Sequence, residues 1–124
     1  LSSSGFFLIA DTCTSEISEA SSWHNEMEKR RDPSHNRCLS KSEWICELDR
    51  ADLPSEFNTS TRVHMQFDSW TKRSATPKLE VSKLKTDWNV APQIAIEEFQ
   101  ITKLQNGDFS FSWPVFVSKS KKRL

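Results

Sequence analysis

The pattern of apolar and polar residues is clearest in the last third of the chain. Residues 94–104 and 109–117 form two runs rich in β-branched and aromatic residues, and Asn106-Gly107 lies between them. An Asn-Gly pair between two such runs is a strong local signal for a β-hairpin. The sequence therefore predicts a C-terminal hairpin whose two arms pack their apolar residues on the rest of the chain.

The loop length of this hairpin follows from the side-chain alternation. A three-residue loop over 105–107 pairs Leu104 with Asp108, whereas a two-residue loop would place apolar residues of one arm opposite polar residues of the other. The three-residue loop aligns two apolar pairs, Ile101 with Phe111 and Phe99 with Trp113. It also requires a left-handed residue, which Gly107 can supply because it has no Cβ.

Pro114 lies inside the second arm of the predicted hairpin. Proline cannot donate a ladder hydrogen bond and is found on edge strands or at bulges. We therefore predict that the last strand has an open edge, which could accept a strand from another protein. The predicted partner-binding residues are Trp113, Pro114, Val115, Phe116 and Val117.

Two helices are predicted in the first half of the chain. The first covers residues 15–31, because apolar residues recur there at helical spacing and Asp32-Pro33 then stops the helix. The second covers 41–51 and begins at Ser40 and Glu43, which have the spacing of a capping box.

The remaining apolar segments are predicted to be strands. Residues 5–10 are a continuous apolar run, typical of a strand buried on both faces, and 61–70 alternate like a half-buried strand. Residues 79–81 begin another short alternating run. With the hairpin, this gives an α+β fold in which an antiparallel sheet of about five strands carries two helices on one face.

The length of 124 residues indicates a single domain over 1–124, and 118–124 read as a basic tail. Because the first residue is Leu1, we expect a piece of a longer protein. No apolar run is long enough to span a membrane and no signal peptide opens the chain, so no membrane partner is expected. The net charge of zero combines an acidic first half, eleven acids and six bases over 1–58, with a basic second half.

Motifs for catalysis and cofactor binding are missing from the sequence. The two glycines of the chain cannot form a glycine-rich phosphate loop, which excludes a P-loop and a dinucleotide-binding fingerprint. No zinc-protease motif, no Cys-x-x-Cys and no nucleophile elbow occurs either. We therefore expect neither an enzyme nor a bound cofactor.

A zinc site is a weaker alternative that the sequence leaves open. His35 and Cys38 have a spacing suited to two ligands of one metal, and two other cysteines lie nearby. The candidate ligands are Cys13, His35, Cys38 and Cys46. The odd number of cysteines favours a reducing compartment, so we expect a nuclear or cytoplasmic protein.

The function that these features favour is a non-enzymatic protein-interaction domain. Its partner would be another protein or a peptide, docked on the open hairpin edge or in an apolar groove. The alternative is a nucleic-acid-binding domain that uses the basic second half of the chain. Its candidate contacts are Lys72, Arg73, Lys119, Lys121, Lys122 and Arg123.

Overall fold

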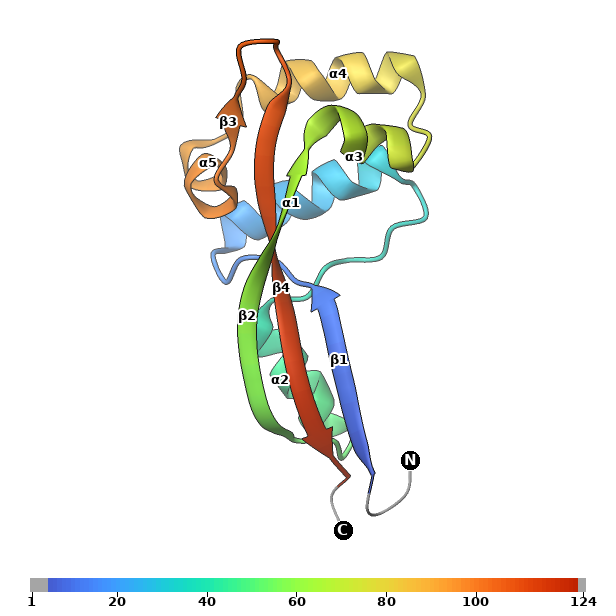
Figure 1. Ribbon diagram of the computed structural model, residues 1–124, viewed down its shortest axis with the longest axis vertical. Coiled ribbons are helices and arrows are strands. Elements are labelled where there is room, and N and C mark those ends of the chain that lie inside the picture. The colour runs from blue at the N-terminus through green and yellow to red at the C-terminus, as the bar shows by residue number, and fades with distance from the viewer. Residues whose placement is uncertain (1–4, 123–124) are drawn as a thin grey trace.

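The computed structural model describes residues 5–122 and contains nine elements in this part of the chain (Figure 1). In chain order these are β1 (Phe6–Thr12), α1 (Ser18–Arg31), α2 (Lys41–Arg50), β2 (Ser55–Gln66), α3 (Phe67–Arg73), α4 (Lys78–Trp88), α5 (Gln93–Phe99), β3 (Thr102–Lys103) and β4 (Phe109–Lys121).

The sheet is built around β4, the last and longest strand. β4 pairs antiparallel with β1 on one side and with β2 on the other, and the short β3 pairs with the start of β4. Within residues 5–122 the fold therefore has five helices and a four-stranded antiparallel sheet. The predicted fold of about five strands with two helices is wrong, because α3, α4 and α5 replace segments that were assigned to strands or loops.

The predicted hairpin turn is present, but its first arm is mostly helical. The backbone N–H of Leu104 donates to the carbonyl of Asp108 at 2.8 Å, and Gly107 has a φ of 87°. The three-residue loop and its left-handed glycine are thus confirmed. However, β3 has only two residues, and the segment before it forms α5 (Figure 1).

The predicted open edge at Pro114 is wrong, since β4 is the central strand of the sheet. Pro114 is opposite Arg62 of β2, and on its other side its carbonyl accepts a hydrogen bond from the N–H of Cys13 at 2.9 Å. The N and the carbonyl of one residue in an antiparallel strand point to the same side. The missing N–H therefore faces Cys13, directly after β1 ends at Thr12, so the proline forgoes one bond at the very end of the β1 ladder and none of those to β2.

Of the five predicted partner-binding residues, Trp113 and Phe116 are buried. Trp113 belongs to the main core, which lies between β4 and the helices α1, α3, α4 and α5. The large apolar side chains of this core are Trp23, Phe67, Trp70, Leu84, Trp88, Phe99, Phe109, Phe111 and Trp113. Each such side chain contributes roughly 1.5–3 kcal/mol by leaving water.

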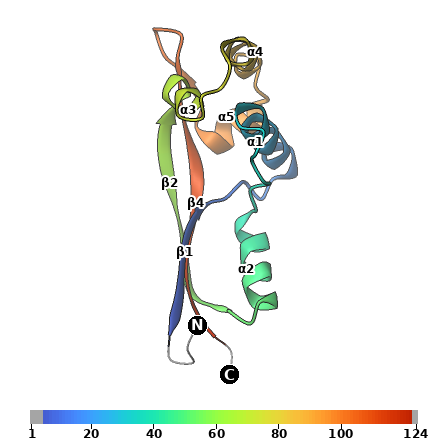
Figure 2. The same ribbon diagram turned by 90° about the vertical axis from the view of Figure 1, so that its right-hand side faces the viewer.

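The two predicted helices are present, but α1 begins at Ser18, three residues later than the predicted start at residue 15. α1 ends at Arg31, directly before Asp32-Pro33. α2 begins with the predicted capping box, in which the N–H of Glu43 donates to Ser40 Oγ at 3.3 Å and the N–H of Ser40 donates to Glu43 Oε1 at 3.0 Å. α2 covers one face of the lower half of the sheet (Figure 2).

The strand predicted at residues 5–10 is present as β1, but it is not buried on both faces. Phe6 is 46% exposed and Leu8 is 72% exposed, because α2 covers only one face of these strands in the part of the molecule described (Figure 2). Residues 118–121, predicted as a tail, continue β4 and pair with the start of β1. No helix within residues 5–122 has the length and apolar character needed to cross a membrane.

Candidate functional site

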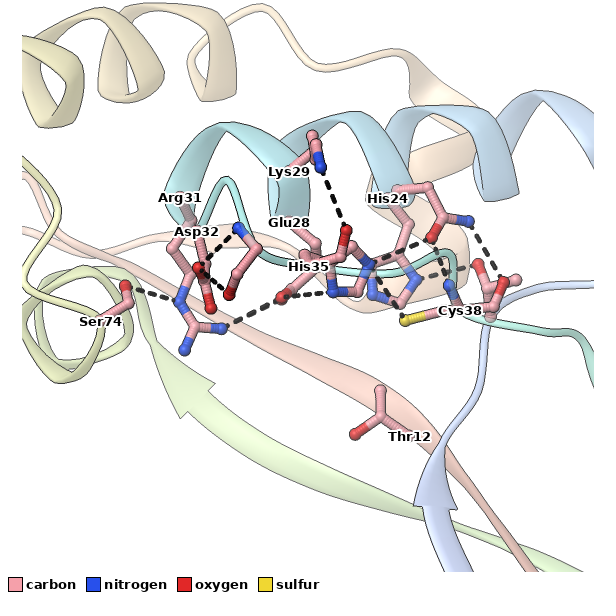
Figure 3. Close-up of polar contacts among 12 residues, drawn as sticks. Thr12, His24, Glu28, Lys29, Arg31, Asp32, His35, Cys38 and Ser74 are labelled. Carbon is pink, nitrogen blue, oxygen red and sulfur yellow. Dashed lines mark hydrogen bonds and ion pairs between the residues drawn. The ribbon is translucent and has the colours of Figure 1, made fainter.

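A cavity of about 570 Å³ lies between the end of β1, helix α1 and the segment 32–39 that follows α1. This volume is within the range of small-molecule binding sites. Its polar lining includes Asp11, Thr12, Glu28, Arg31, His35 and Arg73, and its apolar lining includes Leu39, Trp44, Val63, Met65 and Trp113. Figure 3 shows Thr12 across the open space from Glu28 and His35.

Segment 32–39 is held against α1 by hydrogen bonds from side chains to the backbone. Asp32 Oδ1 accepts from both the N–H and the hydroxyl of Ser34, at 3.0 and 2.7 Å, which makes a tight turn directly after α1. Further along, the Asn25 side chain bonds both backbone groups of Cys38, accepting from its N–H at 2.6 Å and donating to its carbonyl at 3.3 Å. These contacts place the side chains between them at a defined position beside the helix.

Glu28 is a buried carboxylate with several partners (Figure 3). It accepts hydrogen bonds from the indole N–H of Trp70 at 2.9 Å and from the guanidinium of Arg31 at 3.1 Å. Arg31 is itself held by a bond of 2.9 Å from its Nε to Ser74 Oγ. The second oxygen of Glu28 lies 3.9 Å from His35 Nδ1. The site thus has a carboxylate close to a half-buried imidazole, near enough to stabilise a positive charge on that ring.

Cys38 lies beside the same imidazole, with Sγ 3.8 Å from His35 Nε2. Burial, and then the charges of Glu28 and Asp11, raise the pKa of the Cys38 thiol to about 12. The thiol is therefore protonated at neutral pH and is not a nucleophile. The raised pKa therefore disfavours Cys38 as the nucleophile of a cysteine–histidine pair.

His24, one turn of α1 away from Glu28, belongs to the core rather than to the cavity. Its ring stacks on Trp113 with centroids 3.8 Å apart, and its Nδ1 lies 2.9 Å from Thr14 Oγ1. Burial, assisted by the nearby His35, lowers the pKa of His24 to about 3. The ring is therefore neutral in the folded protein at physiological pH.

The chain is 32% identical over 124 residues to the uncharacterized methyltransferase YcgJ of Bacillus subtilis (strain 168), a match that covers 99% of this chain and 49% of YcgJ. It is 28% identical over 100 residues to the uncharacterized protein YafE of Escherichia coli (strain K12), over 80% of this chain and 46% of YafE. No family model matches the chain.

Two crystal structures have a similar fold. The YcgJ protein of Bacillus subtilis superposes with a TM-score of 0.90 at 32% identity, over 100% of this chain and 53% of that chain. A proposed methyltransferase (BH2331) of Bacillus halodurans C-125 superposes with a TM-score of 0.88 at 25% identity, over 97% of this chain and 56% of that chain. The chain is similar to methyltransferases. It spans about half the length of the relatives that it matches.

These similarities contradict the predicted function. The prediction of a non-enzymatic interaction module, with nucleic-acid binding as its alternative, is wrong, because two of these relatives, YcgJ and BH2331, bear the name of methyltransferases. The prediction that the protein is not an enzyme is corrected for the same reason. The sequence analysis relied on missing motifs, and a chain that matches half of an enzyme can lack the motifs located in the other half.

The residues considered for nucleic-acid binding are not brought together. Lys72 and Arg73 end α3, whereas Lys119 and Lys121 lie near the opposite end of the molecule, at the end of β4 (Figure 1). Lys122 follows β4, and Arg123 lies outside the described residues. Arg73 contributes instead to the cavity.

The structure brings together two of the four candidate metal ligands, His35 and Cys38. Cys13 is buried beside Phe116 and α2, and Cys46 is exposed on α2. In the part of the chain that the structure describes, no group of three or more His, Cys, Asp or Glu residues has the geometry to hold a metal ion.

The sequence analysis missed Asn25, Glu28 and Arg31, which organise the cavity. All three lie on α1. Glu28 is only 7% exposed and belongs to the buried side of the helix, together with Ala20, Trp23 and Met27. A carboxylate in a stripe that otherwise faces the core is a usable signal, since carboxylates are almost never fully buried unless they are paired.

Proposed function

We propose that this chain is part of a methyltransferase and that the cavity beside α1 binds the acceptor of the methyl group. The observation that carries the proposal is the similarity to YcgJ along the whole chain, with 32% identity and a TM-score of 0.90. The cavity adds support, because it combines apolar walls with a few polar groups that converge on one space.

Most methyltransferases take the methyl group from S-adenosylmethionine, a sulfonium compound that supplies an electrophilic methyl carbon. The residues of this chain do not fit a site for such a nucleoside donor. A backbone that closely approaches a nucleotide usually needs glycines in a tight turn. Of the two glycines in the chain, Gly107 is at the tip of a hairpin, where an added Cβ would meet no atom within 4 Å. We therefore assign only the acceptor side of the reaction to this chain.

His35 is the residue placed to handle a proton in the cavity. An acceptor hydroxyl or amine must lose a proton when it gains a methyl group, and a positioned imidazole accelerates such a transfer. The carboxylate of Glu28, 3.9 Å from His35 Nδ1, stabilises the positive charge that the imidazole acquires. Val63 and Met65 of β2 add apolar lining to the cavity.

Arg73 supplies a positive charge at the rim of the cavity. Among residues 5–122 it has no hydrogen bond or ion pair, unlike Arg31, which is committed to Glu28 and Ser74. A free guanidinium at this position can bind a carboxylate, phosphate or phenolate oxygen of the acceptor. This favours acceptors that carry an anionic or partly anionic oxygen.

The test uses a hybrid protein in which this chain replaces the segment of YcgJ that it matches. The hybrid is incubated with S-adenosylmethionine and fractionated metabolite extracts, and the formation of S-adenosylhomocysteine is measured. We expect product from at least one fraction, and a decrease of about 100-fold in kcat for His35→Ala, the usual contribution of a general base. His64→Ala is the matched control, because His64 is an exposed imidazole outside this cavity. A folded hybrid that forms no product, or equal losses in both variants, would contradict the proposal.

A nuclear or cytoplasmic location remains part of the proposal. It is supported by the three cysteines, all of which are free thiols in the structure. Labelling of thiols in whole cells tests it, since a protein from an oxidising compartment would show blocked cysteines.

A further inference from the structure

A second cavity, of about 710 Å³, adjoins the first one along strand β2. The two cavities share three lining residues, Val63, Met65 and Arg73. From this shared wall the second cavity extends to Phe111 of β4 and to Gln100, the residue that follows α5. A molecule bound beside His35 in the first cavity can therefore continue past Arg73 into the second.

The backbone of Gln100 has a conformation that is rare for its residue type. Gln100 ends α5 with a φ of 54° and a ψ of 42°, in the left-handed region. Glycine is the usual residue at this position of a helix end, because a Cβ is strained there. Non-glycine residues held in this region are concentrated at binding and active sites. The Gln100 side chain, which lines the second cavity, is therefore a candidate ligand contact.

A hydrogen-bond chain fixes the orientation of the Gln100 amide. The Nε of Arg62 donates to Ser112 Oγ at 2.7 Å, and Ser112 Oγ lies 2.7 Å from the side chain of Gln100. A guanidinium group only donates, so the Ser112 oxygen accepts from Arg62 and its own proton must go to Gln100. Ser112 is 0% exposed, and a buried hydroxyl proton without an acceptor would be destabilising. The Gln100 atom that faces Ser112 is therefore the carbonyl oxygen, Oε1.

This orientation directs the amide nitrogen of Gln100 away from Ser112. Within residues 5–122, Nε2 of Gln100 takes part in no hydrogen bond. Its N–H groups can therefore donate to an oxygen of a molecule in the second cavity. Between Gln100 and the first cavity the lining is apolar, from Val63, Met65 and Phe111. The second cavity thus combines an apolar wall with a pre-oriented donor at its far end.

We propose that the second cavity binds the far end of an elongated acceptor, and that Gln100 donates a hydrogen bond to a carboxylate or carbonyl oxygen at that end. This inference rests on the proposed function, in which the first cavity holds the group that gains the methyl. The acceptor then has its nucleophilic group beside His35, an apolar middle along Val63 and Met65, and an oxygen-bearing end at Gln100. The positive charge of Arg73, which lines both cavities, favours a carboxylate over an uncharged carbonyl at that end.

The test measures binding of 4-hydroxyphenyl alkanoates of increasing chain length to this chain. Each probe has a phenol at one end and a carboxylate at the other, and 4-alkylphenols of equal length end in a methyl group instead. Binding is followed by tryptophan fluorescence, since Trp44 and Trp113 line the first cavity. We expect the Kd to fall at least about tenfold from the shortest to the longest carboxylate, because only a long probe reaches Gln100.

Gln100→Gly separates recognition from a structural role of this residue. Glycine relieves the left-handed backbone, so the midpoint of urea unfolding should not decrease. The same variant should raise the Kd of the long carboxylate about tenfold and leave the Kd of the short carboxylate and of the alkylphenols unchanged. Gln105→Gly is the matched control, because Gln105 is an exposed loop residue that lines neither cavity. It should leave every Kd unchanged.

The proposal is overturned if the chain binds none of the probes, or if a longer chain brings no gain in affinity. It is also overturned if Gln100→Gly leaves the Kd of the long carboxylate unchanged, weakens all probes equally, or lowers the unfolding midpoint. None of these readouts measures methyl transfer. A hybrid that is inactive, or indifferent to His35→Ala, would count against the proposed function alone, whereas a failure of the binding test would leave that activity standing.

Discussion

Acidification from pH 7 to pH 5 should destabilise this protein through a single side chain, His24. The ring is 0% exposed and lies between Trp113 and Phe99, with centroids 3.8 and 4.9 Å from its own. Besides burial, the charge of the nearby His35 contributes to the lowering of its pKa. Burial lowers the pKa of His24 from 6.5 to about 3, so the folded protein holds the ring neutral.

The sign of the effect follows from this depressed pKa. Above pH 6.5 neither the folded nor the unfolded chain protonates His24, and its neutral burial carries no penalty. As the pH falls from 6.5 towards 3, only the unfolded chain binds the proton, and the folded state loses relative stability. Between pH 7 and pH 5 the free energy of unfolding should decrease by about 2 kcal/mol.

Urea unfolding at both pH values measures this decrease, and His24→Phe supplies the reference. Phenylalanine fits a site built from aromatic rings but does not titrate, so the variant should lose about 2 kcal/mol less than the wild type over the same pH interval. The contributions of His64 and the carboxylates are common to both proteins and cancel in the difference, whereas that of His35 cancels only in part because its charge acts on His24. Equal decreases in the two proteins would refute the assignment of the pH dependence to His24.

Three further predictions concern local features. Ser40→Ala should lower the free energy of unfolding by about 1 kcal/mol in thermal or urea unfolding, because Ser40 Oγ caps α2. Gly107→Ala should cost about 1 kcal/mol in the same assay, solely from the φ of 87°, since no atom crowds the new Cβ. Alkylation by iodoacetamide should modify Cys46 at least about tenfold faster than Cys38, because Cys46 is exposed whereas Cys38 is buried with a pKa raised to about 12.

The sequence predicted the elements whose signals are local. α1 with its stop, α2 with its capping box and the three-residue turn at Gly107 depend on residues within one turn of each other, and all are present. By contrast, α5 was assigned to a strand. Its apolar residues change phase if they are placed on a strand, whereas Ala95 and Phe99, four residues apart and both buried, fit one face of a helix.

The burial of β1 is a different kind of discrepancy. Its apolar run correctly indicated a strand, but among the described residues only one face of β1 is covered, and Phe6 and Leu8 are exposed. A sequence pattern reports the environment in which a segment evolved, which can include polypeptide that lies elsewhere. The same reasoning explains why missing motifs wrongly excluded an enzyme.

In the candidate site, a single turn after α1 brings together residues that form no sequence motif. Asp32-Pro33 was interpreted only as the end of α1, yet the turn that it forms with Ser34 reverses the chain along the helix. Residues equally distant from this turn then meet, Glu28 with His35 and Asn25 with Cys38. The spacing of His35 and Cys38 therefore matches that of the two α1 residues they contact, which are also three positions apart. When a helix stops and the chain turns back along it, polar residues on the helix and on the following segment can therefore be paired by their equal distance from the turn. This inference requires that the helix residues facing the segment are polar, at positions where a helix packed on the core would have apolar residues.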